Sequence, residues 1–212
     1  MIVARERPPT LQALWKLAEA RAKTSGSPPE AALERAGLLL HRDLAHGGYD
    51  STPRNSVAFA GTGGDGVHFS FVLRDGLALE DSPIVMTVPM HFDHENLVVG
   101  EDLRDFLAVG CCLSFFVLEQ LTYDRAAFLA AYVAGSDGYQ PDDEQRALLA
   151  RIQLAFGVRP PADLGAHLDA LHERFAAWLE PGEPRPIDTE APTQASLMAY
   201  LETMRRKPPS EP

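Results

Sequence analysis

The sequence has few cysteines, fewer basic than acidic side chains and no long apolar run, and each shortage removes a class of protein. Its two cysteines, Cys111 and Cys112, are neighbours in an apolar stretch, which indicates small core residues and not a disulfide scaffold. Lys and Arg number 19 against 30 Asp and Glu, for a formal net charge of −11. Binding to nucleic acid depends on clustered basic side chains, so we expect no nucleic-acid partner.

The longest apolar runs, such as residues 115–118, fall far below the about 20 residues that cross a bilayer. The opening MIVARERPP lacks the apolar segment of a signal peptide. We therefore expect a cytoplasmic protein with no membrane partner. A length of 212 residues, 45% of them hydrophobic, indicates one domain over residues 1–180 and a proline-rich, charged tail over 181–212. The composition leaves the oligomeric state open.

Two amphipathic helices are predicted before any strand. The first follows Thr10, which can cap it, and ends at Ser25-Gly26. The second begins at the capping box of residues 27–30 and ends at Gly47-Gly48. Its predicted apolar face consists of Leu33, Ala36, Leu39 and Leu40.

The middle of the chain is predicted to form a small antiparallel sheet. Strands are expected over residues 56–60, 67–73 and 84–88, because apolar and polar side chains alternate there between turn signals. The run Gly61 to Gly66 indicates a tight hairpin turn, and short turns between consecutive strands favour antiparallel pairing. In the second strand, His68 and Ser70 face away from the apolar side.

Helices are predicted to follow the sheet. Apolar spacing and capping residues indicate them over residues 102–110, 124–134, 141–157 and 164–178, and an almost wholly apolar helix is expected over 111–121. The predicted fold class is therefore α+β, a small antiparallel sheet covered by N-terminal and C-terminal helices. Its core spans residues 49–123, and a helical part spans 124–180.

The glycine run 61–66 favours a hairpin turn over a phosphate site, and a small-ligand binder that uses this hairpin is kept as a third alternative. It lacks the lysine and the Ser or Thr of a P-loop, and a strand follows it in place of a helix. The cysteines are expected to be buried, which disfavours a thiolate nucleophile, and no Gly-x-Ser-x-Gly motif occurs. We expect no catalytic residue and no cofactor.

The most compact group of metal-binding side chain types is the predicted loop with His91, Asp93 and His94. Glu95 could then act as a base, and His68 could join if its face of the sheet were open. The spacing is not that of a helical pair, and no second group of ligands lies nearby in the sequence. We therefore expect no metal, and a metal-assisted hydrolase is kept as the alternative.

Motifs in the middle of the chain resemble the SUKH superfamily, which includes fungal cell-wall assembly regulators and bacterial immunity proteins. They are Thr-Pro-x-Asn at 52–55, the Phe-Ala and glycine-rich run at 59–69, the Pro-bounded strand at 83–89 and the segment 98–107. The resemblance implies an α+β domain that binds other proteins and that, in bacteria, neutralises toxins, often nucleases.

We therefore expect a non-enzymatic protein-binding domain, and the acidic charge suits a basic toxin as its partner. Loops on a rigid sheet often carry binding residues, so the hairpin and the histidine-containing loop are the predicted contact regions. The predicted partner-binding residues are Gly63, Asp65, His68, His91, Asp93, His94 and Glu95.

Overall fold

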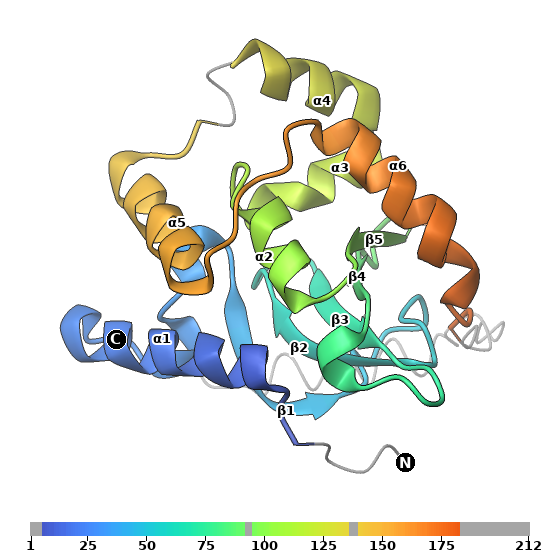
Figure 1. Ribbon diagram of the computed structural model, residues 1–212, viewed down its shortest axis with the longest axis horizontal. Coiled ribbons are helices and arrows are strands. Elements are labelled where there is room, and N and C mark those ends of the chain that lie inside the picture. Colours follow the sequence, from blue (N-terminus) through green and yellow to red (C-terminus); the bar gives the residue numbers. More distant parts are fainter. Residues whose placement is uncertain (1–5, 92–94, 136–139, 183–212) are drawn as a thin grey trace, which may run out of the picture.

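The computed structural model describes residues 6–91, 95–135 and 140–182, and it has an α+β fold, as predicted. Its centre is a five-stranded antiparallel sheet in which each strand pairs with the next along the chain (Figure 1). The strands are β1 (Leu39–Ala45), β2 (Ser56–Gly61), β3 (His68–Val72), β4 (Ile84–Thr87) and β5 (Asn96–Gly100). The predicted strands β2, β3 and β4 are confirmed, whereas β1 and β5 were not predicted.

The α-helices are α1 (Pro9–Ser25), α2 (Leu103–Gly110), α3 (Gln120–Tyr123), α4 (Arg125–Ala134), α5 (Asp143–Phe156) and α6 (Leu164–Phe175). The 3-10 helices are η1 (Pro29–Ala31), η2 (Glu34–Ala36), η3 (Leu79–Asp81), η4 (Phe116–Glu119) and η6 (Ala176–Trp178). Along the chain, α1, η1 and η2 precede the sheet, η3 lies between β3 and β4, and the remaining helices follow β5. Four aspartates cap α2, α4, α5 and α6, each accepting a hydrogen bond from a backbone N–H of the first turn. No helix in the described ranges is long and apolar enough to cross a membrane.

The second predicted helix, over residues 27–47, is wrong. Only two short 3-10 turns form there, and Gly37, with φ 84°, ends the second of them in the left-handed conformation. The following leucines belong to β1, where Leu39 pairs with Gly61 and Leu40 with Ala60. A short run of leucines fits a helix face and a buried strand equally well, and pairing with β2 decides for the strand.

The predicted single helix over residues 111–121 is also wrong, although most of its side chains are buried as expected. Helix α2 ends at Gly110, and Cys111 is its C-terminal cap. The hydroxyl of Ser114 and the backbone N–H of Phe115 then donate to the carbonyl of Ala36, at 2.8 and 2.9 Å. These bonds hold the segment against η2, and the chain turns helical again only at η4.

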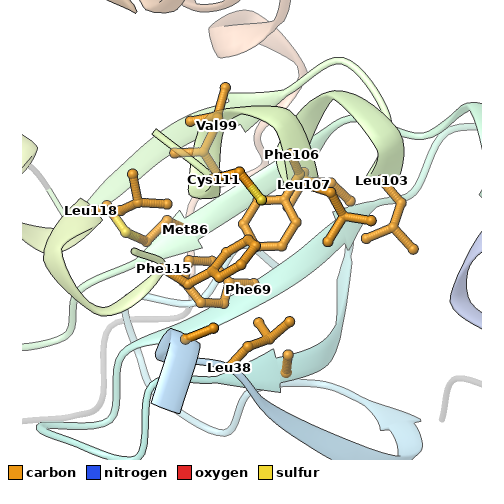
Figure 2. Close-up of a cluster of buried hydrophobic side chains, with 14 of the residues drawn as sticks. Leu38, Phe69, Met86, Val99, Leu103, Phe106, Leu107, Cys111, Phe115 and Leu118 are labelled. Carbon is orange, nitrogen blue, oxygen red and sulfur yellow. The ribbon is translucent and has the colours of Figure 1, made fainter. Parts of the chain in front are cut away.

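The core includes buried side chains of α1, α5 and α6, and its aromatic rings meet between the apolar face of the sheet and α2 (Figure 2). The ring of Phe106 on α2 lies 4.8 Å from that of Phe69, 5.0 Å from that of Phe115 and 5.7 Å from that of Phe59, centroid to centroid. All four side chains are fully buried. Burial of large aromatic side chains is a major source of core stability, so this cluster fixes α2 on the sheet.

The opposite face of the sheet carries polar side chains at one end, but it is not open there. Cross-strand partners His68, Thr87 and Asn96 form a row across β3, β4 and β5. The Asn96 amide donates to the carbonyl of Ser51 at 2.9 Å, and Thr52 is hydrogen-bonded to His68 at 3.1 Å. The connection between β1 and β2 therefore lies across this face. It covers His68, whose side chain is not open to join a metal site.

The end of the described chain is fixed by Asn55. Its amide donates to the carbonyls of Leu73 and Trp178, at 3.1 and 2.9 Å, and accepts from the backbone N–H of Glu180 at 3.0 Å. The guanidinium of Arg74 lies 4.0 Å from the centre of the Trp178 ring. These contacts tie residues after α6 to the sheet. The predicted tail, beyond Gly182, lies outside the described residues.

Candidate functional site

The glycine run forms a compact hairpin between β2 and β3, as predicted. The backbone N–H of Thr62 donates to the carbonyl of Val67 at 3.1 Å, and the backbone N–H of Val67 donates to the carbonyl of Gly64 at 3.0 Å. Asp65 has φ 48° and Gly66 has φ 73°, and Asp65 has the only positive φ among described residues other than glycine. Asp tolerates this conformation better than most residues, so the turn places a carboxylate at its tip.

Tyr49 lies over one side of the hairpin. Its side chain is 44% exposed, and a Cβ on Gly66 would collide with its ring. The ring also stacks on the imidazole of His68, with 5.7 Å between centroids and 19° between planes. The absence of a side chain at Gly66 thus lets the aromatic ring settle directly on the turn.

His68 holds this arrangement from beneath. The imidazole, 4% exposed, has Nδ1 2.8 Å from the carbonyl of Gly66 and Nε2 3.1 Å from the hydroxyl of Thr52. Since a carbonyl only accepts, Nδ1 carries the proton and the hydroxyl can donate to Nε2. Burial lowers the pKa of His68, and the charges of His41 and His46 lower it further, so the ring is neutral at neutral pH. His68 is therefore a positioning residue, which holds Tyr49, Thr52 and the turn at Gly66 in place.

A cleft of about 320 Å³ opens between β1 and the hairpin. Leu39, His41 and Tyr49 form its sides, and several hairpin glycines line the rest. A cleft lined by glycine lets another chain approach the backbone closely.

Phe116, on η4, lies on the other side of the hairpin. Its side chain is 48% exposed, and its Cε2 atom would lie 3.8 Å from a Cβ on Gly64. Glu119 is on the same 3-10 helix. Burial raises the pKa of its carboxyl, and the negative charge of Asp65 raises it further.

The hairpin and the connection between β4 and β5 lie at the same end of the sheet, because Gly61, His68, Thr87 and Asn96 are aligned across its strands. The ring of His91, just after β4, meets that of Tyr123 edge-on at 5.1 Å between centroids. We call this region the sheet-end surface, and it consists of Tyr49, residues 62–67, 88–91 and 95, and residues 116–123.

Four of the seven predicted partner-binding residues belong to this surface: Gly63, Asp65, His91 and Glu95. Gly63 and Asp65 lie on the hairpin, and His91 and Glu95 border the β4–β5 connection, where the backbone of Glu95 accepts from Val88 at 2.7 Å. His68 lies below the surface. Asp93 and His94 lie outside the described residues. Within those residues, no group of three His, Cys, Asp or Glu side chains could hold a metal ion.

Sequence reasoning missed the aromatic residues Tyr49, Phe116 and Tyr123. Each lies in a stretch that was interpreted as connection or core, and the sequence carries no signal that distinguishes an exposed ring from a buried one. Their exposure depends on how η4, α3 and the β1–β2 connection meet the sheet.

Cys111 is a buried core residue, and Cys112 is half-buried against the core. Burial raises the pKa of Cys111 to about 12 and that of Cys112 to about 11. A thiol with so high a pKa is a poor nucleophile at neutral pH, as expected from the sequence. No protein-family model, curated protein or solved structure matches this chain.

Proposed function

We propose that this chain is a protein-binding domain without catalytic activity, which acts by covering a functional surface of another protein. The supporting observation is that most of the exposed large apolar side chains lie at one end of the sheet, on the sheet-end surface. Of the six large apolar side chains exposed in the described part of the chain, four lie there: Tyr49, Met90, Phe116 and Tyr123. Aromatic residues and methionine are enriched in protein interfaces and often carry much of the binding energy.

The negative charge of the chain favours one kind of protein partner. A net charge of −11 favours encounter with a basic protein, because opposite fields steer association. The resemblance to the SUKH superfamily implies toxin neutralisation, and a basic toxin such as a nuclease fits this charge. We propose this as the specific role.

The experiment compares capture of a partner by immobilised full-length chain and by two variants. Phe116→Ala removes an exposed ring from the sheet-end surface, and Leu154→Ala truncates an equally apolar, exposed side chain on α5. A protein retained in stoichiometric amount by the wild type and by Leu154→Ala, but lost with Phe116→Ala, supports the proposal. Equal retention by all three proteins contradicts the proposed surface.

The alternative is a metal-assisted hydrolase that uses His91, Asp93 and His94. Elemental analysis and an assay of hydrolysis distinguish it from the binding role. Stoichiometric metal in the purified chain together with hydrolytic turnover would contradict a purely binding role.

A further inference from the structure

Phe116 offers an open aromatic surface at a fixed place beside the hairpin. A Cβ on Gly37 would collide with the backbone of Phe116, so η4 is closely seated on the turn before β1. On the other side, the ring edge approaches Gly64. Nearly half of the side chain nevertheless faces solvent. A ring with a fixed position and an open face can stack on a group of a second molecule at little cost in conformational entropy.

Two carboxylates accompany this ring. Asp65 is at the tip of the hairpin, and Glu119 follows Phe116 by three residues, one turn of the 3-10 helix. The negative charge of Asp65 contributes to the raised pKa of the Glu119 carboxyl, so the two groups are within electrostatic reach of each other. Neither forms an ion pair with a residue in the described ranges, whereas Glu101 and Asp142 each pair with an arginine.

Arginine over an aromatic ring is a contact that this chain makes elsewhere. The guanidinium of Arg7 lies 4.2 Å from the ring centre of Trp15, that of Arg74 lies 4.0 Å from Trp178, and that of Arg174 lies 4.6 Å from Phe175. No arginine of the described segments lies over Phe116 in this way. The solvent-exposed part of the Phe116 ring thus carries no guanidinium of the described chain.

We propose that Phe116, Asp65 and Glu119 bind an arginine side chain of the partner protein. The guanidinium stacks on the ring and donates hydrogen bonds to the carboxylates. Arginine suits this site better than lysine, because its planar group stacks on rings, carries five donors and is more weakly hydrated. The inference rests on the proposed function, and it specifies that the partner presents an exposed arginine within its contact surface.

A blocked Gly-Arg-Gly peptide tests the site in the full-length chain, and the same peptide with citrulline is a neutral control of similar shape. We expect the arginine peptide to cause saturable NMR shifts at the amides of Gly64 and Asp65. It should also lower the pKa of the Glu119 carboxyl, because a bound cation favours the ionised form. Asp65→Asn should weaken binding about tenfold, equivalent to about 1.4 kcal/mol, and Leu154→Ala should not change it.

No saturable shift at the hairpin, or equal shifts with the citrulline peptide, would overturn the arginine site. Binding measurements with the captured partner then distinguish failure of this inference from failure of the proposed function. Combined Asp65→Asn and Glu119→Gln changes should lower the affinity of the complex and reduce its salt dependence. If Phe116→Ala weakens the complex but the double variant keeps its affinity and salt dependence, the arginine site is wrong and the binding function stands. If neither variant changes the complex, both are wrong.

Discussion

His68 is expected to hold the hairpin and the β1–β2 connection together, and its replacement tests this directly. His68→Ala removes two hydrogen bonds, each worth about 1 kcal/mol, and leaves a cavity beneath Tyr49. It also leaves the buried hydroxyl of Thr52 without this partner. We expect the free energy of unfolding to fall by about 3–5 kcal/mol. His172→Ala, at an exposed position on α6, should change it by less than about 0.5 kcal/mol.

The pH dependence of the free energy of unfolding provides a second test of His68. The pKa of His68 is lowered from 6.5 in the folded chain, so the unfolded chain binds this proton more readily. The stability that neutral His68 contributes is complete above the unfolded value. It is lost as the pH falls from 6.5 towards the folded pKa, with a slope of at most about 1.4 kcal/mol per pH unit. His68→Asn keeps a donor near Nδ1 and removes the titration, which guards against a variant that fails to fold.

Urea unfolding followed by circular dichroism between pH 5 and pH 8 measures both effects. His41 also has a lowered pKa through burial. It titrates in both wild type and His68→Asn, so only its electrostatic coupling to His68 remains in the difference between them. We expect this difference to shrink on acidification. A loss below about 1 kcal/mol in His68→Ala, or parallel curves for wild type and His68→Asn, would refute the account of His68.

Three further predictions concern other parts of the chain. Asn55→Ala breaks the three side-chain hydrogen bonds that fix the segment after α6. We expect the free energy of unfolding in urea to fall by about 2–3 kcal/mol and the fluorescence of Trp178 to change. Unchanged values would contradict the anchoring role. Cys111, with a pKa of about 12, should react with a thiol reagent at pH 8 only after unfolding, and rapid labelling of the native chain would show that it is accessible. Excess Zn²⁺ should leave the melting temperature unchanged to within 1 °C in wild type and in His91→Ala, whereas stabilisation confined to the wild type would favour the metal site.

The parts of the fold that the sequence predicted are those with a local physical cause. Asp124 and Asp142 cap helices where the sequence indicated them, because a short side-chain acceptor meets free N–H groups. The hairpin at 61–66 follows from residues that tolerate positive φ. Strand β3 follows from strict alternation of its apolar side chains.

The errors arise where distant segments decide the structure. Leu39 and Leu40 form a strand because β2 offers partners, and α2 ends at Gly110 because the following segment bonds to Ala36. The sheet-end surface has the same origin. Gly63 and Asp65 could be selected from the turn, but the position of Phe116 beside them results from packing between segments about fifty residues apart.

Hydrogen exchange of the chain with and without its captured partner tests the central claim most directly. The claim is that the partner covers the sheet-end surface, so exchange should slow in residues 61–67 and 116–123 when the partner is added. The exposed face of α5 around Leu154 should exchange at the same rate in both states. Protection confined to α4 or α5, with the hairpin and η4 unchanged, would contradict the claim.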